Sequence, residues 1–250
     1  MKNGAGLTES IVHAPTSDNT GYSYRSAMGM IGSAEFCVFY EDFLKLISTN
    51  VPDGWTAAII DTGATLVQST TAGSLGATGG ALIASDGTSE GVAIYLPKAI
   101  QLTASQKFFM EVMVQTSTAA ETDVRFGLSD LTATSNPEDL WTTTSANLVA
   151  FGTLAGSAYP SMLSDKANSG TSEQTQTSLA MSDTTWAKLA IGYDGSNLMG
   201  FVNGRLALTW SGAAATVPTG VALAPFIGAR TGATAGNVTT YDYVRFVIER

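Results

Sequence analysis

Several segments of the chain carry apolar residues at every second position, which is the pattern of a β-strand with one buried face. The clearest examples are residues 107–115, 123–130, 186–193 and 241–249. Their predicted inward residues are Phe108, Met110, Val112 and Val114; Val124, Phe126 and Leu128; Leu189, Ile191 and Tyr193; and Val244, Phe246 and Ile248. These side chains predict a core large enough for a single sandwich of two sheets.

The stretch 198–210 predicts a β-hairpin, because the Asn203-Gly204 pair favours the two-residue turn that matches strand twist. A symmetric register pairs Val202 with Arg205, Phe201 with Leu206, Gly200 with Ala207 and Met199 with Leu208. One face then holds Met199, Phe201, Leu206 and Leu208, and the other holds Gly200, Val202, Arg205 and Ala207. An isolated hairpin cannot bury so apolar a face, so a second layer is expected behind it.

Further short apolar runs, bounded by turn residues, predict strands at 80–85, 91–97, 147–153, 198–202, 205–210 and 224–230. An aromatic strand signal begins at residue 35, and a weakly helical or irregular stretch follows it to Leu46. The connections 130–147 and 155–184 are polar and are predicted as long loops. We expect an all-β, jelly-roll β-sandwich of two antiparallel sheets over residues 35–250, preceded by an extended N-terminal arm at residues 1–34.

Composition narrows the possible partners. The 250 residues are 44% hydrophobic and only 13% charged, with a formal net charge of −9. Twelve scattered Lys and Arg residues argue against nucleic-acid binding, which needs clustered positive charge. A single cysteine, Cys37, excludes an internal disulfide framework. The chain shows neither a signal-peptide core nor an apolar run long enough to span a membrane, so synthesis in a cytoplasm and no membrane partner are expected.

The late strands carry a resemblance. Trp186, Leu189, Ile191 and Tyr193-Asp194-Gly195, followed by Phe201-Val202-Asn203-Gly204 and the closing Tyr243-Val244-Arg245-Phe246, resemble concanavalin A-like (laminin-G-like) lectin/glucanase jelly rolls. The resemblance covers residues 35–250, and its motifs encode strand pairing and turns, so it implies the fold rather than an activity. The composition of the chain, with few charged residues and one cysteine, together with the expected N-terminal arm, also resembles that of virion proteins of tailed bacteriophages.

The glucanase branch of this superfamily carries paired carboxylates on one strand in the pattern E-x-D-x-x-E. The nearest strand here has Glu111 alone, and Asp123 and Asp130 fall on opposite faces of a regular strand. The only histidine, His13, lies in the expected arm, so no histidine-based triad forms within the sandwich. We therefore expect no enzyme activity.

Lectins of this superfamily often hold Ca²⁺ through clustered side-chain oxygens. The candidate fragments here are Asp61, Asp86, the run with Asp130, Asn136, Glu138 and Asp139, and Asp194 with Asn197. Asp194-Gly195 and Asn136-Pro137 are also ordinary turn formers that bond their own backbone. We expect no cofactor, and a structural calcium ion is the less favoured alternative.

Aromatic residues are the remaining binding candidates. Trp55, Trp141 and Tyr159 fall in or beside loops, where a ring can stack on a glycan or anchor a protein interface. In the arm, Tyr22, Tyr24, Met28, Met30 and Ile31 form an apolar strip that is too short to fold alone and is expected to bind a neighbouring subunit.

These features favour a virion structural protein, specifically a capsid decoration or cement protein that binds the outside of a phage head through its arm. The expected partners are the major capsid protein or other virion subunits, and a homo-oligomer is expected by symmetry. The alternative is a carbohydrate-binding, lectin-like module of a phage tail or fibre.

Overall fold

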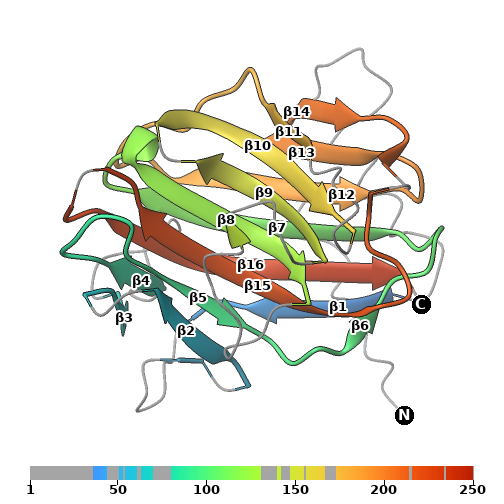
Figure 1. Ribbon diagram of the computed structural model, residues 1–250, viewed down its shortest axis with the longest axis horizontal. Helices are drawn as coiled ribbons and strands as arrows, with labels where there is room; N and C mark the ends of the chain where they lie inside the picture. Colours follow the sequence, from blue (N-terminus) through green and yellow to red (C-terminus); the bar gives the residue numbers. More distant parts are fainter. Residues whose placement is uncertain are drawn as a thin grey trace, which may run out of the picture.

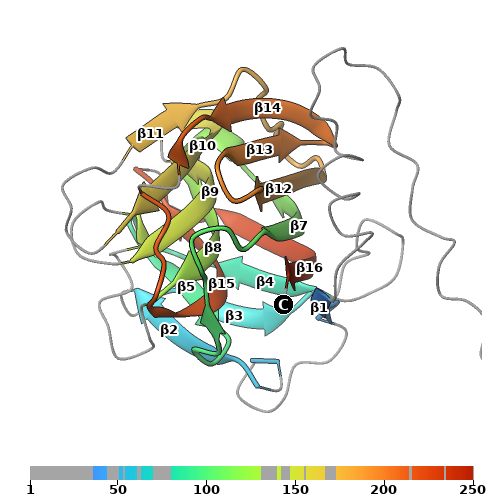
Figure 2. The same ribbon diagram turned by 90° about the vertical axis from the view of Figure 1, so that its right-hand side faces the viewer.

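The computed structural model describes residues 36–43, 51–52, 54–60, 63–69, 80–130, 140–141, 147–154, 156–166, 173–213, 216–233 and 235–249. These residues form two antiparallel sheets that pack face to face (Figures 1 and 2). The predicted all-β sandwich is therefore confirmed. The division between an arm at 1–34 and the sandwich stays a prediction, because residues 1–35 lie outside the described part.

Sheet A orders its strands β14-β13-β12-β7-β16-β4-β3, and β1 pairs with the second half of β16. Its strands are β1 (Phe36–Glu41), β3 (Thr65–Gln68), β4 (Ala81–Ala84), β7 (Phe108–Thr116), β12 (Ala187–Tyr193), β13 (Leu198–Val202), β14 (Arg205–Trp210) and β16 (Val238–Glu249). The long β16 pairs with β7 along one side, so β4 and β1 follow each other along its other side.

Sheet B orders its strands β11-β10-β9-β8-β15-β5-β2, and β6 pairs with the start of β15. Its strands are β2 (Thr56–Ile60), β5 (Gly91–Tyr95), β6 (Ile100–Gln101), β8 (Thr122–Ser129), β9 (Leu148–Leu154), β10 (Ser157–Asp165), β11 (Glu173–Gln176) and β15 (Ala222–Thr231). A short 3₁₀ turn, η1 (Ala119–Glu121), connects β7 to β8. No helix within the described ranges is long and apolar enough to cross a membrane.

The inner faces of the two sheets meet in one apolar core. The predicted inward residues of β7, β8, β12 and β16 all belong to it, and only Ile248 among them is partly exposed. Tyr241 of β16 crosses this core, and its hydroxyl donates a hydrogen bond of 2.6 Å to the carbonyl oxygen of Gly228 in β15. The two sheets are thus joined by a buried polar contact as well as by apolar packing.

The hairpin β13–β14 follows the predicted register only near its turn. Asn203 and Gly204 have positive φ values of 52° and 77°, and Phe201 pairs with Leu206 as expected. A β-bulge then shifts the register, so Gly200 pairs with Leu208 instead of Ala207. Leu208 therefore packs against the core between the sheets, and the prediction that it shares a face with Phe201 is wrong.

The connection at 155–184 is not only a loop, because it contains β10 and β11. The sequence does not predict β10 because this segment contains Pro160 and several serines. Proline removes a ladder hydrogen bond, and serine is a weak strand former. The structure accommodates Pro160 at an irregularity in the pairing of β9 with β10, between Ser157 and Ser161. The short strands β2, β3 and β6 were also missed, because they give too few residues for an alternation to be visible.

The paired strands β12 and β13 offer a matched test of core packing. A Cβ at Gly200 would lie 2.7 Å from the Phe151 ring, whereas a Cβ at Gly192 would be 3.4 Å from the nearest atom. We expect Gly200→Ala to lower the free energy of unfolding by about 1–3 kcal/mol, because the buried ring has no room to move. Gly192→Ala should be neutral or slightly stabilising. Urea unfolding measures both, and equal effects would contradict this account of the core.

Candidate functional site

The outer face of sheet B, which points away from the core, is formed by every second residue of its strands. One row of residues crosses the sheet in register: Gln176, Ser161, Gly152, Arg125, Gly228, Ala93 and Ala58. Apart from Gln176 on the edge strand and Arg125 at the centre, every member is Gly, Ala or Ser. The row is a strip of small residues with one long cationic side chain.

Arg125 is fully buried at the centre of this row. None of its three guanidinium nitrogens has a hydrogen-bond acceptor in the part of the chain that the structure describes. Burial lowers the pKa of Arg125 to about 10, with Asp123 opposing this shift and Arg230 adding to it. The guanidinium therefore remains protonated at neutral pH, and it is a buried cation whose donors are not used by described residues.

Asp123 and Arg230 form an ion pair in the adjacent cross-strand row. Nε and Nη2 of Arg230 donate to the same carboxylate oxygen of Asp123 at 2.9 and 2.6 Å. The Asp123 side chain is almost completely buried, whereas that of Arg230 is 20% exposed. Among the described residues of these two rows, two guanidinium groups therefore face a single carboxylate.

Trp141 lies over the same row and is 4% exposed. Its Cη2 atom is 3.1 Å from the position that a Cβ at Gly228 would occupy, so a glycine is needed under the ring. The Arg230 guanidinium stacks on the indole at 5.4 Å from the ring centroid. The indole Nε1 has no hydrogen-bond acceptor among the described residues.

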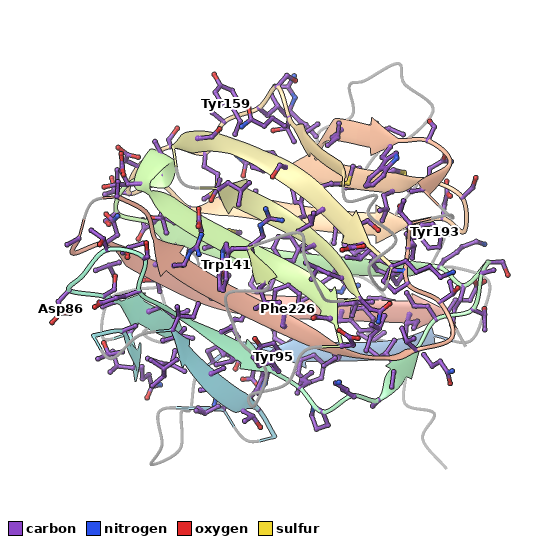
Figure 3. The ribbon with its side chains drawn as sticks, viewed as in Figure 1. Asp86, Tyr95, Trp141, Tyr159, Tyr193 and Phe226 are labelled. Atoms are coloured by element: carbon purple, nitrogen blue, oxygen red, sulfur yellow. The ribbon has the colours of Figure 1, made fainter. Side chains whose placement is uncertain are left out.

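An apolar cluster continues from Trp141 across sheet B. Its buried members are Ala58, Ile60, Ala93, Tyr95, Leu140, Trp141, Leu148, Ala150, Leu163 and Phe226. Figure 3 shows Trp141, Phe226 and Tyr95 following one another across β8, β15 and β5. Leu140 and Trp141 come from the predicted loop at 130–147, so these two residues of the connection pack on the outer face of the sheet.

The structure separates the three aromatic residues expected to bind a glycan or a protein. Trp55 is buried in the main core, where its ring packs against Phe39 and Phe43. Tyr159 is 45% exposed and lies in β10, at a margin of the sandwich away from Trp141 (Figure 3). Only Trp141 therefore belongs to the site on sheet B. The arm residues Tyr22, Tyr24, Met28, Met30 and Ile31 lie outside the described residues.

The carboxylates on the strands do not form a glycosidase pair. On the outer face of sheet B, Asp123 and Asp165 are three cross-strand rows apart, which is roughly 20 Å along the strands. Glycosidases hold their two carboxyl groups about 5–9.5 Å apart. Glu111 lies on the opposite side of the molecule, on the outer face of sheet A, where it accepts a hydrogen bond from Tyr243.

The proposed calcium ligands act as turn residues where the structure describes them. Asp194 accepts hydrogen bonds from the backbone N–H groups of Ser196 and Asn197, and Asp130 accepts one from that of Asn147. Asp86 and Glu90 both approach Gly63 at another turn. In the described ranges, no group of three or more His, Cys, Asp or Glu side chains is placed to hold a metal ion. Asp61, Asn136, Glu138 and Asp139 lie outside those ranges.

No protein-family model and no curated protein sequence matches the chain. Among solved structures, arcelin-5, a lectin-like defense protein from Phaseolus vulgaris, matches with a TM-score of 0.56 at 13% identity, over 86% of this chain and 99% of arcelin-5. A Bacillus licheniformis β-glucanase matches with a TM-score of 0.52 at 11% identity, over 84% of this chain and 97% of the glucanase. The fold is that of the concanavalin A-like lectins and glucanases.

A third neighbour of this lectin-like sandwich is a carbohydrate esterase from Shiga toxin-encoding bacteriophage phi24B. It matches with a TM-score of 0.52 at 13% identity, over 86% of this chain and all of the esterase. The neighbours thus include lectins and enzymes, and the shared fold assigns no activity by itself.

Sequence reasoning missed Arg125 as a member of the site. The alternation in β8 put Val124, Phe126 and Leu128 on the inner face, so Arg125 was left on a face that was expected to be solvated. The available signal was Gly228, since a glycine within a strand can mark a position where another part of the molecule approaches the sheet closely, as Trp141 does here.

The buried Glu111 of the lectin-like sandwich predicts a pH dependence of stability. Burial raises the pKa of Glu111, while the hydrogen bond from Tyr243 and the charges of Lys188 and Arg245 oppose this shift. As the pH rises above the ordinary value, the unfolded chain ionises first, so stability falls until the raised pKa is passed. Glu111→Gln removes this loss.

We therefore expect the stability of Glu111→Gln relative to the original protein to increase between about pH 4 and pH 7, as measured by urea unfolding. Tyr243→Phe should act in the opposite direction, since it removes a hydrogen bond that favours the ionised carboxylate. A difference that does not change with pH would contradict this placement of Glu111.

Proposed function

We propose that this lectin-like sandwich is a non-enzymatic structural protein of a phage particle, which decorates or cements the head by binding its outer surface. Four of the five large apolar side chains that are exposed among the described residues support this proposal. Val38 and Tyr40 of β1, Ile59 of β2 and Val67 of β3 are 56%, 55%, 58% and 36% exposed. We call these residues the docking margin.

The docking margin lies at one end of both sheets. β1, β2 and β3 gather at the same margin in both views, opposite β11 and β14 (Figures 1 and 2). β3 ends sheet A and β2 ends sheet B, and β1 pairs only with β16, so each has a free backbone edge in the described part of the chain. Exposed apolar residues on free edges are typical of surfaces that bind another protein chain.

Residues 1–34, the expected arm, precede β1 in the sequence, and β1 contributes Val38 and Tyr40 to the docking margin. In the proposed mechanism the arm lies along neighbouring virion subunits, including the major capsid protein, and the margin packs against the shell. The net charge of −9 suits a particle surface that must stay soluble. The phage esterase neighbour is a precedent for this sandwich in phage proteins.

A carbohydrate-binding module of a tail or fibre is the second candidate. It is favoured by the lectin neighbours and by the aromatic side chains on sheet B, where Trp141 covers the centre of the face. In this alternative Trp141 contacts a host glycan, and Tyr159 provides a separate aromatic contact at the margin of β10.

The double substitution Val38→Lys with Ile59→Lys tests the docking margin. Both side chains are more than half exposed, so the sandwich should still fold. Binding to phage heads assembled without this chain should weaken by about tenfold or more, because an interface would then have to bury unpaired ammonium groups. Co-sedimentation of the purified protein with the heads measures this change.

Tyr159→Lys is the matched control, since it changes an exposed aromatic residue away from the docking margin. It should leave binding to the heads unchanged. Equal binding by the double variant and the original protein would contradict the proposed margin. Glycan-array binding that Trp141→Ala abolishes, together with no binding to heads, would favour the lectin alternative.

A further inference from the structure

The outer face of sheet B contains buried donors that the described part of the protein does not use. Nε, Nη1 and Nη2 of Arg125 have no acceptor there, and neither does Nε1 of Trp141. Burying such groups without partners is costly, and the cost is larger for a charged guanidinium than for a neutral indole. A retained, unpaired arginine at the centre of a sheet therefore indicates an acceptor that is not part of the described chain.

Arg125 and Trp141 belong to one place on this face. Gly228 is the cross-strand partner of Arg125, and Trp141 lies directly over Gly228. Arg230 links the two groups, because it stacks on Trp141 and pairs with Asp123, two residues before Arg125 on the same face of β8. Arg125 and Trp141 thus occupy neighbouring positions on the strip of small residues that crosses the sheet.

The chemistry of this place favours an anion with two acceptor oxygens. Its unused groups at Arg125 and Trp141 are all donors, and the described charged groups of the two rows are two guanidinium groups and one carboxylate. A guanidinium matches the planar fork of a carboxylate better than any other common acceptor. The ring of Trp141 and the neighbouring Phe226 and Tyr95 add an apolar wall for the organic part of a ligand.

We propose that Arg125 and Trp141 form a binding site for a small organic carboxylate on the outer face of sheet B. The carboxylate accepts hydrogen bonds from the Arg125 guanidinium and from the Trp141 indole N–H. Asp123 keeps Arg230 in its ion pair, so Arg125 is the cation available to the ligand. Gly152 and Gly228 flank Arg125 in the cross-strand row, and the space over Gly228 becomes available to the ligand only when the Trp141 ring moves away from it.

Because Trp141 covers Gly228 closely, the ligand enters by displacing the indole from its position over the sheet. Binding therefore changes the environment of this tryptophan, and the change is visible in its fluorescence. The site is on the broad face of sheet B and not at the docking margin. Carboxylate binding and binding to phage heads are therefore tested separately, and either proposal can be wrong without the other.

The test titrates the full chain with sodium acetate, sodium glucuronate, glucose and sodium chloride at matched ionic strength, and follows Tm and tryptophan fluorescence. We expect either or both carboxylates to raise Tm and change the fluorescence, while glucose and chloride do neither. A response to glucuronate alone identifies a sugar acid as the ligand, and a response to acetate identifies a simpler carboxylate. No response to either carboxylate beyond that of chloride overturns the proposal.

Two variants assign the response to the site. Arg125→Met keeps an unbranched side chain of similar length and should abolish the rise in Tm without lowering stability in the absence of ligand, since it removes a buried unpaired charge. Arg125→Lys keeps a charge but loses the planar fork, so the carboxylate response should weaken. This variant provides the test if Arg125→Met does not fold. Arg205→Met, at an exposed position of β14, should leave the response unchanged. A response that persists in Arg125→Met overturns the proposal.

Discussion

The structure depends on close packing against both faces of sheet B, and Gly228 is where the two contacts meet. On the core side, the Gly228 carbonyl oxygen accepts the hydroxyl of Tyr241 from sheet A. On the outer side, Trp141 lies so close to Gly228 that a Cβ would be 3.1 Å from the ring. A side chain at this one position would disturb the core contact of β15 and the aromatic cover over Arg125 together.

This packing constraint explains why the strands of sheet B contain few charged side chains. A sheet that is covered on both faces needs apolar or small residues at nearly every position, and β8 is buried along its whole length. Of the charged residues that remain on its outer face, Asp123, Arg125 and Arg230 lie in adjacent rows near Trp141, and Asp165 lies three rows from Asp123. Among the described residues of this face, Asp123 and Asp165 lie too far apart to act as a glycosidase pair.

Much of the fold could be predicted from the sequence because the interior strands of both sheets bury a regular alternation of residues. The inward residues of β7 and β12 and the turn at Asn203-Gly204 follow from local rules. The bulge that moves Leu208 to the core face could not be predicted, since it depends on packing between sheets. Strand β10 could not be predicted because Pro160 lacks the N–H that a regular strand needs. The irregular pairing that accommodates this proline cannot be seen in the sequence.

The candidate site was less predictable than the fold. Trp141 could be selected from the sequence as a candidate aromatic, but its position over Gly228 depends on the three-dimensional arrangement of a connection and a sheet. Arg125 was ignored because an arginine at an alternate strand position is usually solvated. Its burial results from cover by residues distant in the sequence, which no local pattern encodes.

The decoration role is tested most directly by cryo-electron microscopy of phage heads that lack this chain, mixed with the purified protein. The account predicts density for the sandwich at regular sites on the head, with the margin formed by Val38, Tyr40, Ile59 and Val67 facing the shell and residues 1–34 traced along neighbouring subunits. Undecorated heads, or a sandwich bound only at the tail through the face that carries Trp141, would contradict it.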